Sequence, residues 1–265
     1  MTRNIHTFDN KIKVYDDHLI SVQRERYKKR NVHEAEEEDI FIEIIKSIPA
    51  DGCFVNIGCA IGYYSLLAKK LAPDLTIHAI EPLERHRLFF NENIVLNGLK
   101  QSDFIIHTEG IASSKGKAEF LDSGYGSMIC TNKQPQNLYS LVRGFLKAFV
   151  AQVDRETSNT TQTIKTKTLD GLCKEIRRPV DFCQMDVQGL EVDVLHGARH
   201  SLKTGNIKTF LIGTHGAKLH DECVNILTQE NYVIEYSNSD TKEQPDGIVV
   251  ASKYCQRLSI AKSKP

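Results

Sequence analysis

The chain has 265 residues, of which 40 % are hydrophobic, and its 34 Lys and Arg residues balance 34 Asp and Glu residues for a formal net charge of zero. A chain of this length can bury one sizeable core, so one domain with small additions is expected. Because the net charge gives no field that would gather nucleic acid or anionic lipid, neither is expected as a partner.

The hydrophobic pattern of the first half alternates between helices and strands. Asn31 and Glu34 have the spacing of a helix-capping box, which predicts a helix that runs through Ile48. In chain order the pattern then predicts a strand at 53–57, a helix that ends before Pro73, a strand at 76–80, a helix that ends at Asn97, and a short strand at 104–107.

The alternation of strands and helices is interrupted over residues 109–163 and resumes with the strand at residue 180. Residues 109–120 favour a hairpin or strand extension, and residues 123–163 are interpreted as an insertion or cover with a helix at 138–153. The pattern then predicts a strand at 180–185, a helix over 190–202, a strand at 207–212, a helix over 219–227, and an antiparallel pair of strands at 232–236 and 248–251.

Repeated strand-helix units predict an α/β fold with a mostly parallel sheet and helices on both faces. We expect an N-terminal extension and helix over residues 1–48, followed by the main domain over residues 49–265. The ligand sites of such sheets lie beyond the carboxyl ends of the strands, which is where functional residues are sought.

The seven cysteines are odd in number and form no CxxC pair, which predicts reduced thiols. The N-terminus lacks the apolar segment of a leader, and no stretch approaches eighteen uncharged apolar residues. We therefore expect a cytoplasmic protein without membrane insertion, and a homodimer stays an open alternative.

The segment NIGCAIG, residues 56–62, joins the strand at 53–57 to the next helix. Gly58 and Gly62 are spaced GxxxG, so neither the dehydrogenase GxGxxG nor a Walker sequence is present. Such a turn suits S-adenosylmethionine, which has an amino-acid end and a nucleoside end. Glu81, at the end of the second strand, is placed to accept both ribose hydroxyls. The alternative is that the glycines only permit tight packing and that Glu81 caps a helix.

Four segments occur in one order along residues 50–215: FVNIGCAIGYYSLLAKK, AIEPLERHRLFFNENIVLNGL, IASSKGKAEF, and KTLDGLCKEIRRPVDFCQMDVQGLEVDVLHGARHSL. In these segments the chain resembles the FkbM family of S-adenosylmethionine-dependent methyltransferases. The resemblance implies a class I, Rossmann-like methyltransferase sheet, with the cofactor over the first two strands and the acceptor beyond the later ones. Members chiefly methylate hydroxyls of natural products and sugars, and some methylate peptide amides.

Three positions depart from the family pattern. The family usually has Asp at the position of Asn56, Glu at that of Gln188, and often Glu near that of Gly213. Asn56 keeps an acceptor oxygen but loses the charge that would face the ammonium group of the cofactor. These changes leave two alternatives open, a different acceptor or an inactive descendant.

Two residues are predicted to carry the chemistry. His215 follows the fifth principal strand and is the preferred base, because an unperturbed imidazole is largely neutral near pH 7. Asp186 ends the fourth strand and is expected to position the acceptor or hold the amino group of the cofactor, the alternative being an N-cap. The residues assigned to the cofactor are Asn56, Gly58, Cys59, Ile61, Gly62, Tyr63, Glu81, Pro82, Gly110, Ile111 and Asp186.

The leading hypothesis is O-methylation of a hydroxyl on a small natural product, sugar or glycan. N-methylation of a peptide or amide, a non-catalytic S-adenosylmethionine-binding protein, and a nicotinamide oxidoreductase are the alternatives. No metal site is expected, since the His, Asp and Glu residues after Asp186 show no fixed ligand spacing.

Overall fold

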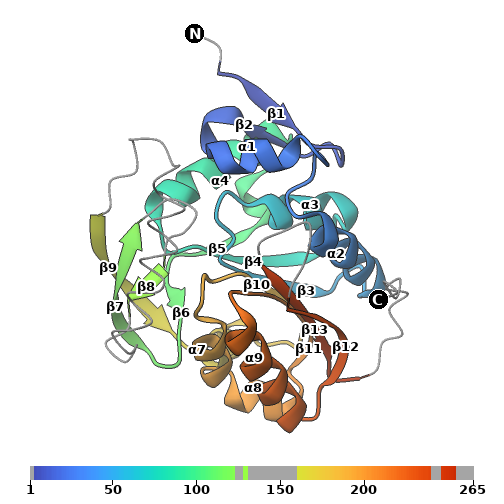
Figure 1. Ribbon diagram of the computed structural model, residues 1–265, viewed down its shortest axis with the longest axis vertical. Helices are drawn as coiled ribbons and strands as arrows, with labels where there is room; N and C mark the ends of the chain where they lie inside the picture. The colour runs from blue at the N-terminus through green and yellow to red at the C-terminus, as the bar shows by residue number, and fades with distance from the viewer. Residues whose placement is uncertain (1–2, 123–127, 131–159, 240–245, 255–265) are drawn as a thin grey trace.

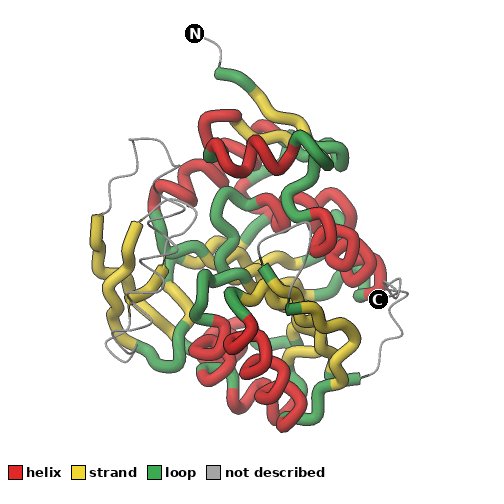
Figure 2. Tube along the Cα trace, in the orientation of Figure 1, coloured by secondary structure: helices red, strands yellow, loops and turns green. Residues whose placement is uncertain are grey.

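The computed structural model describes residues 3–122, 128–130, 160–239 and 246–254. Figure 1 shows a central sheet with helices packed against it and a second, smaller sheet beside it. Figure 2 separates helices, strands and loops in the same orientation. The fold is the predicted α/β class, with a mostly parallel sheet between two layers of helices.

The chain begins with elements that the sequence pattern does not predict. β1 (Ile5–Thr7) and β2 (Lys13–Tyr15) form an antiparallel hairpin, and α1 (Ser21–Tyr27) follows a short 3-10 turn. Phe8 and Ile12, between the two strands, are fully buried and join the same core cluster as the central sheet. The N-terminal extension is therefore part of the main hydrophobic core.

The central sheet has seven strands in the order β12-β13-β11-β10-β3-β4-β5. The strands β3 to β5, β10 and β11 pair in parallel, whereas β13 is antiparallel to both its neighbours, which confirms the predicted antiparallel pair near the C-terminus. The strands are β3 (Cys53–Ile57), β4 (Thr76–Ile80), β5 (Ile105–His107), β10 (Val180–Met185), β11 (Ile207–Thr214), β12 (Val233–Asn238) and β13 (Gly247–Ser252).

Alternate residues of each strand serve two separate cores, as the pleat of a strand requires. Phe54 and Phe182 face one helical layer, and Val55 and Cys183, one position later on the same strands, face the other. The first layer holds α2 (Ala35–Ser47), α3 (Tyr63–Leu71) and α4 (Glu84–Leu96), and the second holds α6 (Leu169–Ile176), α7 (Glu191–His196), α8 (Arg199–Thr204) and α9 (Ala217–Gln229).

The second sheet has the order β6-β9-β7-β8, built from β6 (Gly110–Ile111), β7 (Gly116–Asp122), β8 (Met128–Cys130) and β9 (Thr160–Lys167). β6 and β7 confirm that residues 109–120 are extended, but both strands pair with β9 and do not form a hairpin with each other. The end of the predicted insertion, residues 160–163, belongs to β9. The predicted helix at 138–153 lies outside the described residues.

Two predicted helix boundaries are wrong. Asn31 is not the cap of α2, because its side chain bonds His6 and the carbonyl of Thr7, while Glu34 occupies the N-cap position. The single helix predicted over 190–202 is two helices, α7 and α8. Asp170 separates them by accepting the backbone N–H groups of His200 and Ser201, which start α8 as a new helix.

None of the described helices is long and apolar enough to cross a lipid bilayer. The five cysteines with described side chains, Cys53, Cys59, Cys173, Cys183 and Cys223, are buried and free. This agrees with the predicted reduced thiols at those positions.

Removing the Asp170 carboxylate should destabilise the fold. Asp170 holds two N–H groups of the first turn of α8 at 2.8 and 2.9 Å, and loss of such a cap costs about 0.5–2 kcal/mol. The measurement is the free energy of unfolding of Asp170→Ala in urea. Asp221→Ala, on the exposed surface of α9, is the control and should unfold like the unmodified chain. Equal stability of Asp170→Ala and the unmodified chain would contradict the capping role.

Candidate active site

The turn between β3 and α3 packs tightly against the carboxyl ends of β4 and β10. Gly58 has a φ of 79°, and a Cβ at this position would lie 2.0 Å from the carbonyl oxygen of Asp186. Gly62 has a φ of 87°, and its Cβ would lie 1.9 Å from the Phe90 ring. Both positions therefore require glycine, for backbone conformation and for space. The backbone N–H groups of Gly58 and Cys59 donate to the carbonyl of Ile80, which ties the turn to the end of β4.

Glu81 is the carboxylate that organises this turn. One of its oxygens accepts the N–H of Ala60 at 2.9 Å and the other accepts the N–H of Leu83 at 2.8 Å. His86 Nδ1 lies 3.6 Å from Glu81 Oε2. Leu83 is the N-cap residue of α4, so Glu81 holds the N–H group of the cap residue and not an N–H group of the first helical turn. A carboxylate has about four lone-pair positions, and two N–H bonds leave acceptor capacity toward the pocket.

Asn56 is buried and belongs to a line of side-chain hydrogen bonds inside the sheet. Its oxygen accepts the hydroxyl of Ser65 at 2.8 Å, and its NH₂ donates to Gln184, the residue opposite it on β10. Gln184 in turn donates to Glu37 Oε1 at 3.0 Å. Asn56 thus links α3 to α2 through β10, in addition to lining the pocket.

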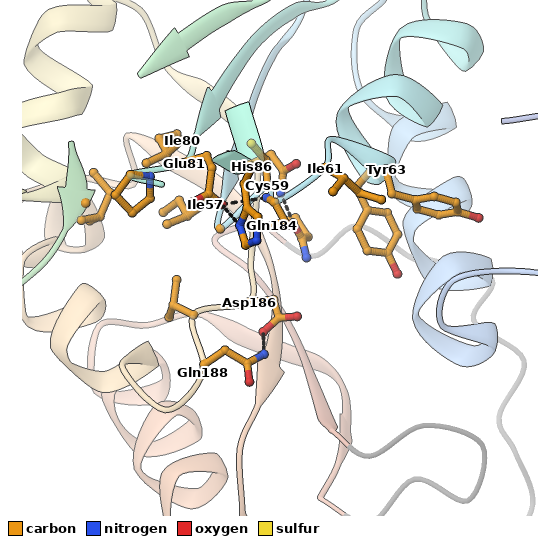
Figure 3. Close-up of a pocket in the computed structure, with 18 of the residues that line it drawn as sticks. Ile57, Cys59, Ile61, Tyr63, Ile80, Glu81, His86, Gln184, Asp186 and Gln188 are labelled. Atoms are coloured by element: carbon orange, nitrogen blue, oxygen red, sulfur yellow. Dashed lines mark hydrogen bonds and ion pairs between the residues drawn. The ribbon is translucent and has the colours of Figure 1, made fainter. Parts of the chain in front are cut away.

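One pocket lies at the carboxyl edge of β3, β4 and β10 (Figure 3). Figure 3 places Glu81 and His86 on one side of it and Asp186 with Gln188 on the other. The structure brings together most of the residues that the sequence assigns to the cofactor: the pocket is lined by Asn56, Gly58, Cys59, Ile61, Tyr63, Glu81, Pro82, Gly110, Ile111 and Asp186. Gly62 and His215 do not line it.

Tyr63 is one of the residues that line the pocket, but its hydroxyl is used elsewhere. The Tyr63 hydroxyl donates to Glu38 and accepts the NH₂ of Asn10 at 2.7 Å. This phenol therefore fastens the N-terminal extension to α3. Tyr64, also in the pocket lining, is buried and its hydroxyl has no hydrogen-bond partner among the described residues.

Asp186 follows β10 and is not an N-cap, because α7 begins five residues later with Leu190 as its cap. Asp186 Oδ1 accepts a hydrogen bond from Gln188 at 3.0 Å. Burial raises the pKa of Asp186 to about 6, although the nearby His215 opposes this shift. Asp186 is thus the predicted site residue that joins the pocket to the groups around His215.

The expectation that His215 is a neutral imidazole is wrong. Its Nδ1 lies 2.8 Å from Glu191 Oε1, and its Nε2 lies 3.2 Å from Asp246 Oδ1 and 3.6 Å from Asp186 Oδ1. Burial by itself would lower the pKa of His215, but Glu191, Asp246 and Asp186 together raise it well above its usual value. An imidazolium at neutral pH cannot accept a proton, so the reason for choosing His215 as the base is lost.

Further carboxylates reach this region from parts of the chain that the sequence does not connect with the site. Glu34 and Glu37 come from the start of α2, and Asp246 directly precedes β13. Burial, followed by the charge of Asp186, raises the pKa of Glu37 to about 8. In the sequence, Glu34 and Glu37 belong to an acidic run at the start of a helix. Such a run commonly stabilises the helix and does not by itself indicate a site.

The comparisons with known proteins agree with this geometry. A family model described as the methyltransferase FkbM domain matches residues 53–236. The fold is similar to that of a methyltransferase FkbM from Methylobacillus flagellatus, with a TM-score of 0.51 and 14 % identity over 76 % of this chain and 44 % of that one. This chain thus spans less than half of that relative.

A second similar structure is a putative rRNA methylase from Clostridium thermocellum, with a TM-score of 0.50 and 8 % identity over 83 % of this chain and 97 % of that one. Identities this low support the fold alone. No curated protein matches the chain.

The contribution of Glu37 to the stability of the fold should fall as the pH rises from about 4.5 to 8. Glu37 has an ordinary pKa of 4.5 and a pKa of about 8 in the fold, so across this window the folded state keeps a proton that the unfolded state has released. Burial and the charges of Asp186 and Asp246 disfavour ionisation of Glu37, and these effects outweigh its hydrogen bonds with Gln184 and Glu34. Urea unfolding at several pH values in a metal-free buffer measures the slope.

Glu37→Gln keeps an oxygen for Gln184 but cannot ionise, so its unfolding free energy should fall less, or rise more, with pH than that of the unmodified chain. The same pH slope in both proteins would show that Glu37 ionises normally in the folded state.

Proposed function

Since the chain belongs to the FkbM family of S-adenosylmethionine-dependent methyltransferases, we propose that it transfers a methyl group from this cofactor to a hydroxyl of a small molecule or glycan. The observation that carries the proposal is the pocket in which the glycine turn, Glu81 and Asp186 meet at the carboxyl edge of the parallel sheet. This edge is where α/β sheets bind nucleotide-like ligands.

The cofactor fits the two sides of this pocket by its chemistry. Gly58 lets the backbone of the turn lie close to the ligand, and Glu81, whose oxygens already hold the turn and the start of α4, has acceptor positions left for the two ribose hydroxyls. The methionine end carries an ammonium and a sulfonium, and Asp186 is the pocket carboxylate available to them. Asn56 has no charge to offer the ammonium group. The oxygen and the NH₂ group of its side chain are already hydrogen-bonded to Ser65 and Gln184.

Methyl transfer requires alignment above all. The acceptor oxygen attacks the methyl carbon in line, the new C–O bond forms, and the C–S electron pair stays on sulfur. Holding the two reactants in that geometry contributes roughly 7–11 kcal/mol. Asp186 lies between the cofactor pocket and the cluster of carboxylates, so we propose that it positions the acceptor. His215 serves as a charged partner of Asp186, Glu191 and Asp246 and not as the base.

The acceptor side is polar and rich in oxygen atoms. Asp186 and Gln188 line the pocket, and the buried Glu37 hydrogen-bonds the pocket residue Gln184. Gly213 lacks a side chain beside Glu37 and Asp186. Such a surface matches a polyhydroxylated acceptor, whose hydroxyls can donate to carboxylates, better than an apolar one.

Calorimetric titration with S-adenosylmethionine and S-adenosylhomocysteine should give micromolar binding, and NADH should give none. Glu81→Gln should weaken cofactor binding at least tenfold. It removes the charge and one of the acceptor oxygens, while Glu84→Gln, at the exposed start of α4, should bind like the unmodified chain.

If neither S-adenosylmethionine nor S-adenosylhomocysteine binds, the proposed function is contradicted. Unchanged affinity in Glu81→Gln would contradict the assignment of Glu81 to the ribose. Binding without methyl transfer to any hydroxyl acceptor in a broad screen would favour the non-catalytic alternative.

A further inference from the structure

Three carboxylates from distant parts of the chain meet beside the cofactor pocket. Oxygen atoms of Glu34, Asp186 and Asp246 all lie within 4.8 Å of one another. Glu34 and Asp246 are buried, and Asp186 is half-buried. Glu34 is the N-cap of α2, Asp186 follows β10, and Asp246 precedes β13, so only the folded chain assembles them.

Two cationic side chains lie near these carboxylates. Arg26 Nη1 lies 3.6 Å from Glu34 Oε1, beyond hydrogen-bonding distance. His215 Nε2 lies 3.2 Å from Asp246 Oδ1 yet makes no hydrogen bond. Three close carboxylates in a buried site repel one another when they are ionised, and either a proton or a bound cation relieves this repulsion.

A second, independent observation indicates a missing ligand. Tyr64 is only 7 % exposed, and its hydroxyl has no partner among the described residues. The residue lines the pocket together with Asp186, and the carboxylates that act most strongly on its hydroxyl are Glu37 and Glu34. A buried hydroxyl facing these acids needs a bound molecule to hydrogen-bond, such as a water or an acceptor oxygen held by an ion.

We propose that Glu34, Asp186 and Asp246 bind one divalent cation of the Mg²⁺ or Mn²⁺ type at the acceptor side of the cofactor pocket. Carboxylate oxygens are the ligands these hard cations prefer, and the ions keep further positions for water or substrate oxygens. Tyr64 is placed to donate to one of those oxygens. This revises the sequence-based expectation that the protein has no metal site.

The site has a chemical role if the proposed function is correct, and this part of the inference rests on it. His215 does not line the pocket, and both of its ring nitrogens face carboxylates, so it is not placed to activate the acceptor hydroxyl. A divalent cation lowers the pKa of a hydroxyl bound to it. The O–H bond then breaks with the proton passing to water, the oxygen attacks the methyl carbon, and the C–S electron pair leaves with sulfur.

The test is Mn²⁺ binding to the full, chelator-treated chain, followed by electron paramagnetic resonance of free Mn²⁺ without cofactor or acceptor. The expected result is one saturable site per chain, with affinity lowered at least tenfold in Asp246→Asn and in Glu34→Gln. Asp193→Asn is the matched control. Asp193 is a half-buried carboxylate on α7 outside the triad, and its replacement should leave the affinity unchanged.

Absence of a saturable site, or equal affinity in the triad variants and the unmodified chain, would overturn the proposal. Thermal melts of both triad variants establish that they fold, and the two independent positions keep the test decisive if one of them does not. Because the assay contains no cofactor, Mn²⁺ binding without S-adenosylmethionine binding would count against the proposed function alone. The converse result would count against the metal site alone.

Discussion

The arrangement of the site depends on a buried line of hydrogen bonds that runs from Ser65 through Asn56 and Gln184 to Glu37. Asn56 and Gln184 stand opposite each other on β3 and β10, so the parallel register of the sheet brings their amides together. Buried polar groups are costly unless each finds a partner, and this line satisfies them by joining α3 to α2. It thereby holds the start of α2, with its carboxylates, against the pocket.

This constraint gives the N-terminal extension a place in the site. Its hairpin contributes Phe8 and Ile12 to the main core, and Asn10 bonds the hydroxyl of Tyr63. The family match covers residues 53–236, so Glu34 and Asp246 both lie outside it. The pocket residues that we propose for the cofactor thus lie in the family domain, whereas the neighbouring acidic cluster is completed by flanking segments. Flanking segments are free to differ between proteins that share a fold, which suits a role in acceptor choice.

The elements that the sequence predicts well are those whose evidence is local. The strands β3, β4 and β10 are short apolar runs beside turn residues, and the glycine turn with Glu81 is visible as a spacing along the chain. The failures have a common cause in tertiary contacts. Asn31 has the spacing of a cap but bonds Thr7 instead, and the helix predicted over 190–202 is divided because Asp170, from another helix, caps its second half.

The sequence by itself determined the fold class and the family, and it indicated ten of the residues that line the pocket, because periodicity and the strand-turn-helix pattern are properties of neighbouring residues. Only the tertiary structure placed His215 among Asp186, Glu191 and Asp246 and brought Glu34, Asp186 and Asp246 together. A pKa depends on burial and on the charges within a few ångströms. These groups become neighbours only when α2, β10 and β13 pack at one edge of the sheet.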